Sequence, residues 1–556
     1  MPVYEDWVFA EATPADPPGS LGVRSPQIAS LIRAAGVSSE EEFRRFTRPA
    51  LGDLHDPSTI SGMQEACERI EAAVRAGERV VIYGDYDVDG VTSIVLLRTV
   101  LRSLGCEVSW VVPHRVYDGY GLTIPVLDRI LDEQKVGLVI TVDCGITSTE
   151  AVEHAIARGL DVIITDHHLP PEQLPAATVV LNPRQEGCEY PFKDLAGVGV
   201  AFKLCCELIR RAGRSMSVAS LAKIAALGTI ADVAPLIGEN RTIVKIGLDG
   251  LASSRNHGLK ALLRNLKLLG RPLRSFDVGF RIGPRINAAG RIASADTAVR
   301  LFECLDEPSA FALVLELEKM NQHRKSLQQA ALEDAERQVE SQTGSNILIV
   351  AGEEWHQGVV GLCAGRLAER HHRPVLAARM TEDQCIGSGR SPNGVDLHGL
   401  LKTVGHLFTK WGGHERACGF SVAREQWPVL GESLRRAAAA IEIPPRRLNV
   451  AAELRFEEIE AGFLRELGLL EPWGEGNPQP HFATAGVRVH GKREFAENCW
   501  SVELSHGGIR KNAVLWPSRT ELLPSLESEN SIDCAYTVES SRYEPDGVRL
   551  VIEDIR

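Results

Sequence analysis

Three aspartates at every second position form the densest group of possible metal ligands in the chain. Asp85, Asp87 and Asp89 lie in the segment GDYDVDG, after the apolar run 80–83 and before an amphipathic stretch that begins at Val91. Carboxylates this close repel one another at neutral pH unless a cation lies among them. Oxygen ligands at this density suit hard divalent ions such as Mg²⁺ or Mn²⁺. A solvated acidic turn is the alternative that this segment leaves open.

Two further apolar runs end in groups of the same kind. Asp143 follows one β-branched run, and the triplet Asp166, His167 and His168 follows the next. Because the carboxyl ends of parallel strands meet at one edge of a sheet, these groups should converge on the first three acids. A single aspartate at a strand end is often only a helix cap, but three such ends together favour a metal site. Asp232 adds an acid at the end of a helical run, where its charge opposes the helix dipole unless a cation is near.

The elements that must position these groups alternate along the chain. Between residues 65 and 235, apolar strands alternate with helices, which predicts βαβ units and a parallel sheet with helices on both faces. A long helical pattern over 306–342 leads to a second α/β pattern after residue 345. From about residue 448, short strands with tight turns predict a small Greek-key barrel of the OB type. The predicted fold class is α/β: a parallel-sheet domain joined by a long helix to a smaller α/β domain, plus a C-terminal all-β barrel.

Composition is that of an ordinary globular protein. The chain has 556 residues, of which 44% are hydrophobic and 24% charged, and this length suits roughly three or four domains. No apolar run approaches the ~18 residues of a membrane span, and the start MPVYEDW lacks the parts of a signal peptide, so we expect a cytoplasmic protein with no membrane contact. Twelve cysteines without a C-x-x-C pair indicate free thiols. The net charge of −13 does not suggest a nucleic-acid binder, but it leaves room for a local basic groove.

The segments GDYDVDG, VDCG, TDHH and GTIADVAP resemble, in order and spacing, the four motifs of the DHH phosphoesterase superfamily. Together with the downstream segments, the resemblance covers nearly all of the chain. Within the superfamily the chain is most similar to the RecJ type of single-strand-specific 5′→3′ exonuclease. The resemblance implies five parts: an N-terminal extension (1–45), a DHH phosphoesterase domain (46–300), a connecting helix (301–344), a DHHA1 domain (345–447) and an OB-fold domain (448–556).

The same resemblance implies a role for each acid and imidazole of the motifs. Two Mn²⁺ or Mg²⁺ ions per active site would be held by five ligands: Asp87, Asp89, Asp143, His167 and Asp232. Asp143 would bridge the ions, and His168 would face the substrate phosphate or assist proton transfer. Asp85 would be a further or outer ligand, and Asp166 would orient an imidazole. Two such ions make hydroxide available at neutral pH, and in-line attack then releases a 5′-mononucleotide.

Arginines beside glycines or aromatic residues are candidates for nucleic-acid contacts. Arg115 lies among tyrosines in the loop 113–121, where it can hold a phosphate, or the loop is only a glycine-rich surface turn. Three arginines in the segment GFRIGPRINAAGR can bind the phosphate backbone or pair with carboxylates: Arg281, Arg285 and Arg291. The glycines of 195–201 are explained equally well by phosphate binding and by close packing of a helix on a sheet.

Two downstream segments have the composition of anion sites. In GSGRS, backbone N–H groups and a guanidinium can grip a phosphate, although such a segment is as often a plain turn. The resemblance implies that Ser388 and Arg390 recognise the 5′-phosphate and that His414 points into the cleft near the metals. In the predicted barrel, five side chains are candidates for binding a single strand: Trp500, Trp516, Tyr543, Arg493 and Lys511.

The residues alone indicate a divalent-metal phosphoester hydrolase. The resemblance extends this to a single-stranded-DNA-specific 5′→3′ exonuclease of recombination and DNA repair. It implies a monomer that acts on single-stranded DNA with a 5′ end, together with a single-strand-binding protein and a RecQ-type helicase. One alternative is a DHH-family oligoribonuclease or cyclic-dinucleotide phosphodiesterase, whose members generally lack the C-terminal barrel. The other is a relative that binds nucleic acid without catalysis.

Overall fold

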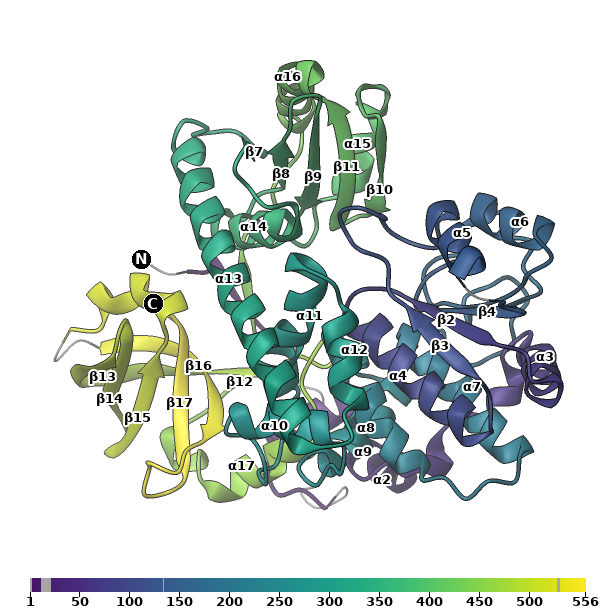
Figure 1. Cartoon of the computed structure of the whole chain (residues 1–556). Coiled ribbons are helices and arrows are strands. Elements are labelled where there is room, and N and C mark those ends of the chain that lie inside the picture. Colours follow the sequence, from purple (N-terminus) through teal and green to yellow (C-terminus); the bar gives the residue numbers. More distant parts are fainter. Residues whose placement is uncertain (1–2, 12–21, 134, 528–530) are drawn as a thin grey trace. The chain divides into compact units, whose positions relative to one another are not determined.

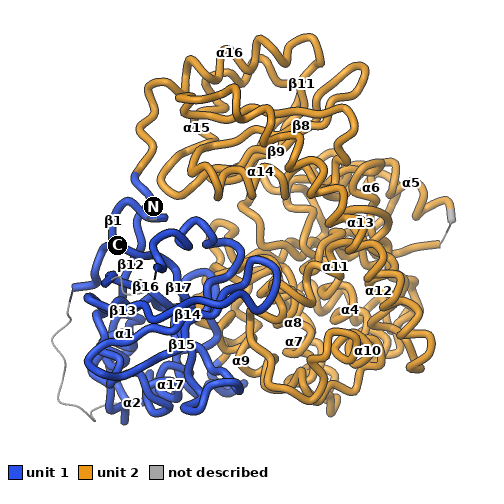
Figure 2. Tube along the Cα trace, turned by 90° about the vertical axis from the view of Figure 1, so that its left-hand side faces the viewer, with its two compact units in different colours: residues 1–53, 445–556 blue, residues 54–444 orange. Residues whose placement is uncertain are grey.

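The structure is a computed structural model that describes residues 3–11, 22–133, 135–527 and 531–556. The chain forms two compact units (Figure 2). One contains residues 54–444, and the other contains residues 1–53 and 445–556. Each unit has a hydrophobic core of its own. In the described part of the chain, no helix has both the length and the apolar character needed to cross a membrane.

The larger unit begins with a five-stranded sheet in the order β3-β2-β4-β5-β6, in which every neighbouring pair is parallel. Its strands are β2 (Val80–Gly84), β3 (Val108–Val111), β4 (Leu138–Val142), β5 (Asp161–Thr165) and β6 (Val179–Leu181). The register pairs Gly84 with Val142 and Val142 with Thr165, so the loops after β2, β4 and β5 begin level with one another. The predicted parallel sheet is confirmed.

Helices cover both faces of this sheet (Figure 1), because alternate side chains of its apolar strands point to opposite faces. In β2, Val80 and Ile82 belong to the core that includes α3, α4 and α7, whereas Val81 and Tyr83 pack with α5 and α6. The helices of this domain are α3 (Met63–Ala76), α4 (Val88–Ser103), α5 (Ile124–Glu133), α6 (Thr149–Ala157), α7 (Gly197–Arg211), α8 (Val218–Ala231), α9 (Gly238–Leu251), α10 (His257–Asn265), α11 (Gly283–Ile292) and α12 (Asp296–Glu303).

The long helix α13 (Glu307–Glu340) connects this domain to a second sheet. Asp306 caps its N-terminus by accepting from the backbone N–H of Ser309 at 2.8 Å. The second sheet has the order β10-β11-β9-β8-β7. Its elements are β7 (Leu348–Gly352), α14 (Gln357–His371), β8 (Val375–Met380), β9 (Gln384–Arg390), α15 (Leu397–Lys402), β10 (Lys410–His414), β11 (Ala417–Ala423) and α16 (Trp427–Ala438).

The smaller unit contains a closed five-stranded barrel. Its strands are β13 (His481–Ala496), β14 (Cys499–His506), β15 (Ile509–Leu515), β16 (Ser531–Ser540) and β17 (Val548–Ile555), and pairing of β13 with β16 closes it. The predicted OB-type barrel is confirmed. β12 (Arg447–Glu453) extends the sheet, and α17 (Ala461–Leu467) packs on it.

The N-terminal residues contribute an edge strand and two helices to the smaller unit: β1 (Asp6–Phe9), α1 (Pro26–Ala34) and α2 (Glu40–Thr47). β1 pairs with β12 in parallel, and Trp7 Nε1 donates to the buried carboxylate of Asp554 at 2.7 Å. Residues of α1 and its flanks, such as Val23, Ile28, Ile32 and Val37, thus share a core with the C-terminal barrel. The twelve cysteines of the chain are all free thiols, as the sequence indicates.

Candidate metal centre

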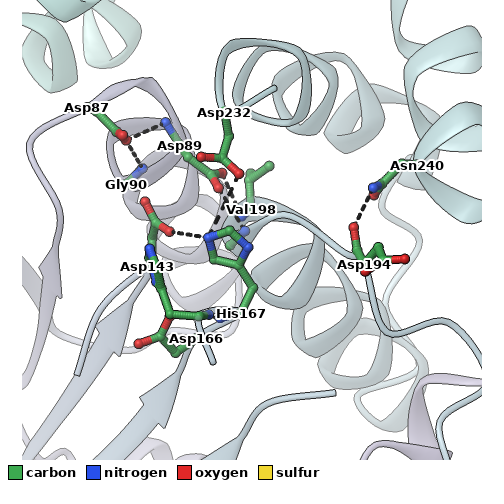
Figure 3. A network of polar contacts seen from close by, with 12 residues as sticks. Asp87, Asp89, Gly90, Asp143, Asp166, His167, Asp194, Val198, Asp232 and Asn240 are labelled. Atoms are coloured by element: carbon green, nitrogen blue, oxygen red, sulfur yellow. Dashed lines mark hydrogen bonds and ion pairs between the residues drawn. The ribbon is translucent and has the colours of Figure 1, made fainter. Parts of the chain in front are cut away.

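The loop after β2 presents its acids at the N-terminus of α4. Asp87 caps this helix, because its Oδ1 accepts from the backbone N–H groups of Asp89 at 2.9 Å and Gly90 at 3.1 Å (Figure 3). Asp85 accepts from the N–H of Tyr86 at 2.8 Å and is buried. The negative carboxylates therefore lie at the positive end of a helix, which stabilises their charge.

Asp89 is held by a second helix N-terminus. Its two carboxylate oxygens accept from the backbone N–H groups of Gly197 and Val198 at the start of α7, each at 2.7 Å. A Cβ on Gly197 would lie 2.5 Å from Asp143 Oδ1, which is too close for any other residue without a shift. Close packing against the carboxylates therefore explains this glycine of the segment 195–201. The sequence contains no sign that these two N–H groups serve Asp89.

Asp143 and His167 face each other from the ends of β4 and β5 (Figure 3). Asp143 Oδ1 lies 3.2 Å from His167 Nε2, which in turn lies 3.8 Å from Asp232 Oδ2, just past the end of α8. Asp143 adopts a left-handed backbone conformation with φ of 60°, which is rare for a residue with a side chain. Both Asp143 Oδ1 and His167 Nε2 are buried without a hydrogen-bond partner. Since an unpaired buried polar atom costs about 1–3 kcal/mol, these two atoms fit a cation between them.

Asp166 lies beside this group but is fully engaged with the protein. Its Oδ1 accepts from His168 Nδ1 at 2.7 Å and from the N–H of His167 at 2.7 Å, and its Oδ2 accepts from the N–H of Ile146 at 2.9 Å. These hydrogen bonds hold the loop and the His168 ring in place, and the predicted role of Asp166 in catalysis stays a prediction.

Two residues that sequence reasoning missed also hold His168. Tyr120 Oη lies 3.2 Å from His168 Nε2, and Asn182, buried just after β6, donates from Nδ2 to the His168 carbonyl at 2.8 Å. Tyr120 belongs to the loop with aromatic residues around Arg115, so the sequence showed a tyrosine there. It did not show that His168 is the partner of this tyrosine. For Asn182, the only sequence feature that could have indicated a role at the site is its position directly after a strand.

The pKa values of four acids in the cluster are raised. Burial, and then the charge of Asp87, raises the pKa of Asp85 to about 8 and that of Asp89 to about 7. Burial and the neighbouring carboxylates raise the pKa of Asp143 and of Asp232 well above the usual range. Such a cluster keeps its charge at neutral pH only when positive charge is supplied, which divalent ions do.

The pKa values of His167 and His168 are shifted in opposite directions. Burial, followed by the charge of His168, lowers the pKa of His167 to about 3. Its imidazole is therefore neutral, the form that binds a metal. Burial opposes protonation of His168 as well, but the hydrogen bond to Asp166 and the surrounding acids raise its pKa to about 9. The hydrogen bond to Asp166 therefore favours the protonated form of the His168 ring.

Among the residues that the structure describes, three overlapping trios of side chains offer ligand atoms that lie within 4.8 Å of one another. They are Asp143, His167 and His168; Asp89, His167 and Asp232; and Asp85, Asp87 and Asp143. Asp143 belongs to two of these trios and can therefore serve two neighbouring ions. Carboxylate oxygens with an imidazole suit Mn²⁺ and Mg²⁺. The donor set thus fits the pair of hard divalent ions that the sequence predicts.

Arg115 and Arg291 lie close to the metal-site loops. The Arg115 guanidinium stacks 3.8 Å above the Tyr86 ring, and its Nε donates to the Gly290 carbonyl at 3.2 Å. Burial, and then the positive charge of Arg115, lowers the pKa of Arg291 to about 10, while Asp87 raises it. Arg291 also donates to the carbonyl of Gly358 in α14 at 3.2 Å, so it links the two α/β domains.

Ser388 and Arg390 form a small polar group on β9. Arg390 Nη1 donates to Ser388 Oγ at 2.6 Å and to the Gly389 carbonyl at 2.8 Å. A Cβ on Gly361 of α14 would lie 3.3 Å from both side chains, so the first turns of this helix pass beside them. His414 is exposed at the end of β10.

Arg281 and Arg285 are paired with carboxylates, the alternative that the sequence left open. Arg281 Nη1 donates to Asp277 Oδ1 at 2.9 Å, and Arg285 Nε donates to Glu318 Oε2 at 2.9 Å. Their part in nucleic-acid binding stays a prediction. In the barrel, Lys511 is buried and paired with Asp546, whereas Tyr543 is exposed beneath Arg542.

Comparisons with known proteins match most of the chain. Residues 79–229 match the model of the DHH family, N-terminal domain, residues 344–442 that of the DHHA1 domain, and residues 450–554 that of the RecJ OB domain. The single-stranded-DNA-specific exonuclease RecJ of Escherichia coli (strain K12) is 34% identical, with 97% of each chain covered. The protein of the same name from Bacillus subtilis (strain 168) is 36% identical over 86% of this chain, which spans only 61% of that relative. The crystal structure of RecJ in complex with Mn²⁺ from Thermus thermophilus matches 99% of this chain and 79% of that one, with a TM-score of 0.84 and 29% identity.

Proposed function

This chain belongs to the RecJ family of single-stranded-DNA-specific exonucleases, and we propose that it removes nucleotides from the 5′ end of single-stranded DNA by metal-dependent hydrolysis. The observation that carries this proposal is the pair of buried, unpartnered atoms Asp143 Oδ1 and His167 Nε2, 3.2 Å apart among further acids. These donor atoms would bind divalent cations, and the cations would in turn bind a phosphate oxygen of the substrate.

We propose five protein ligands for two Mn²⁺ or Mg²⁺ ions: Asp87, Asp89, Asp143, His167 and Asp232. Ions bound there would lower the pKa of a shared water molecule and neutralise charge on the scissile phosphate. The hydrogen bonds from α7 hold Asp89 in place, and Asp143 would offer one oxygen to each of the two ions. Asp85 lies in the same cluster and supports the ions as a further or outer ligand.

His168 acts on the substrate in this proposal. Asp166 accepts from Nδ1 of its ring, which leaves the Nε2 proton for a phosphate oxygen or for the leaving oxygen. The hydrogen bond to Asp166 raises the pKa of His168 and so favours the ring that carries this proton. Asp166 and Tyr120 keep the ring in one orientation.

We propose that the 5′-phosphate is bound by three cationic or hydroxyl side chains of the DHH and DHHA1 domains: Arg115, Ser388 and Arg390. Arg291, which bridges the two domains, is proposed to contact the next part of the backbone. We also propose that the DNA strand is contacted by Arg281, Arg285 and His414. A pocket for a terminal phosphate would limit cleavage to one end of the DNA.

The cellular setting is part of the proposal. We propose that the enzyme acts as a monomer in recombination and repair, in the bacterial cytosol, on strands delivered by a RecQ-type helicase and a single-strand-binding protein. The proposed division of labour follows the domains given above: catalysis in the DHH domain (46–300), phosphate recognition in the DHHA1 domain (345–447) and strand capture in the OB-fold domain (448–556).

A cleavage assay tests the proposed function. The protein is incubated with Mn²⁺ and single-stranded DNA carrying a labelled 5′-phosphate, with the matched duplex and a chelator as controls. Release of labelled mononucleotide from the single strand alone, abolished by the chelator, is the expected result. Cleavage only of very short RNA or of cyclic dinucleotides would point to the other branch of the superfamily, and binding without cleavage would point to a non-catalytic relative.

A further inference from the structure

Two phenylalanine rings lie stacked and exposed on the larger unit. The rings of Phe276 and Phe280 have centroids 4.8 Å apart at an interplanar angle of 26°, and the two residues are 61% and 70% exposed. They flank and occupy a π-helical segment, Asp277–Ile282, that leads directly into α11. A π-helical turn is rare and frequently marks a functional site. Two exposed apolar rings held together in this way form a small apolar surface that a ligand can cover.

The π-helical segment packs on the end of α8, which leads into the proposed ligand Asp232. A Cβ on Gly279 would lie 3.9 Å from Ile230 Cγ2, two residues before Asp232. Phe280 is the next residue after Gly279. The phenylalanine pair therefore belongs to the same packed group of elements as one edge of the metal centre.

The same segment also touches the loop that carries the first acids. A Cβ on Gly283 would lie 3.6 Å from Ala231 Cβ and 4.0 Å from Val88 Cγ2, and Val88 lies between Asp87 and Asp89. Asn287 Oδ1, one turn farther along α11, accepts from the N–H of Val88 at 3.1 Å. The helix that carries the phenylalanines is thus fixed to two ligand-bearing segments at once.

We propose that Phe276 and Phe280 form a stacking surface for unpaired bases of the strand that is cut at the metal centre. This inference rests on the proposed function and extends it from the phosphates to the bases. Every base has a π-face, so exposed aromatic rings bind a single strand without regard to sequence. Arg281 lies in the same turn, and its side chain is 39% exposed. Its positive charge can attract the phosphate backbone of a strand whose bases stack on the rings.

This surface also contributes to the choice of single-stranded over double-stranded DNA. In a duplex each base is stacked on its neighbours and paired, so its face is not available to a protein ring unless the base is unstacked at a cost of a few kcal/mol. A strand that already has free base faces pays little of that cost. The rings therefore favour the binding of single strands over duplexes.

A substrate series with abasic nucleotides tests the inference. Release of mononucleotides in Mn²⁺ is measured as kcat and KM for 5′-phosphorylated oligonucleotides, each with one abasic nucleotide at a successive position. For the unmodified strand, Phe276→Ala/Phe280→Ala should raise KM roughly tenfold or more with little change in kcat, since uniform binding is lost. In the wild-type protein, an abasic nucleotide at the stacking position should have a similar effect, and the double variant should not be affected further by it.

Controls make the result specific to the aromatic faces. Phe280→Trp should keep a low KM, and Phe311→Ala, which removes an exposed ring from α13, should change nothing. The inference is overturned if the double variant has the KM of the wild type, or if abasic nucleotides at every position affect both proteins alike; the rings would then serve a protein partner. If the wild-type protein releases no mononucleotide, the proposed function fails instead, and quenching of 2-aminopurine fluorescence in bound strands still reports stacking on the rings.

Discussion

Asp143 Oδ1 and His167 Nε2 lie 3.2 Å apart at the ends of neighbouring parallel strands, and both atoms are buried without a hydrogen-bond partner. The register that pairs Val142 with Thr165 brings the loops after β4 and β5 together. No short stretch of sequence contains this pair, because its members belong to different strand ends. The relationship supports the proposed metal centre and leads to the first prediction.

Asp143→Ala should abolish hydrolysis while leaving single-strand binding intact. The substitution removes the carboxylate shared by two of the three ligand trios, and a loss of several kcal/mol of charge stabilisation lowers the rate by at least about 1,000-fold. Calorimetric titration with Mn²⁺ should show fewer bound ions. Asp128→Ala, which removes an exposed carboxylate paired with His154, is the matched control. Full activity of Asp143→Ala would refute the two-metal assignment.

Gly197→Ala should weaken metal binding and lower the free energy of unfolding. The added Cβ would meet Asp143 Oδ1 at 2.5 Å, and overpacking of this kind costs about 1–3 kcal/mol. Thermal melts with and without Mn²⁺ measure both effects. Gly365→Ala in α14 is the control, because nothing lies within 4 Å of its added Cβ; it should be neutral or slightly stabilising. Equal melting temperatures for both variants would contradict the close approach.

Asp166→Asn should move the alkaline limb of the pH profile of kcat to lower pH. In the wild-type protein the hydrogen bond to Asp166 helps raise the pKa of His168, so the imidazolium persists to higher pH than it would without this partner. The amide cannot stabilise that charge equally, so the His168 proton is lost at lower pH. Profiles from about pH 6 to about pH 10 in Mg²⁺ give the shift. Asn182→Ala removes the hydrogen bond to the His168 carbonyl, so it should lower kcat without moving the alkaline limb of the profile. An unmoved limb in Asp166→Asn would exclude His168 as the titrating group.

A fragment of residues 54–444 should keep kcat and lose affinity for long single strands. It contains all five proposed ligands and the cores of the larger unit, whereas the smaller unit holds the barrel. KM should rise more for long oligonucleotides than for short ones. A chain that lacks only residues 448–556 should aggregate, because Ile28 and Ile32 of the N-terminal segment are buried in the core of the smaller unit. An equal loss of kcat and affinity in the 54–444 fragment would count against a role of the barrel in strand capture.

The acids and histidines of the site were predicted from their types, because each follows an apolar strand or helix and the rule for parallel sheets brings strand ends together. The supporting contacts were not. Nothing near Asp89 in the sequence points to the N–H groups of Gly197 and Val198, since such donors belong to the backbone and have no residue signature. Arg285 likewise has two possible partners in the sequence, phosphate or carboxylate, and only the packing of α11 on α13 provides Glu318.

The sequence by itself determined the order of the elements and the types of the acids and imidazoles at the candidate site, because hydrophobic periodicity and side-chain chemistry are local properties. Tertiary structure alone decided which distant groups meet. It pairs β1 with β12, which lie far apart in the sequence, holds Asp89 with α7, and packs the π-helical segment after Phe276 against the end of α8. The physical reason is that these contacts depend on strand register and helix packing, which arise only when all of the apolar surfaces are buried at once.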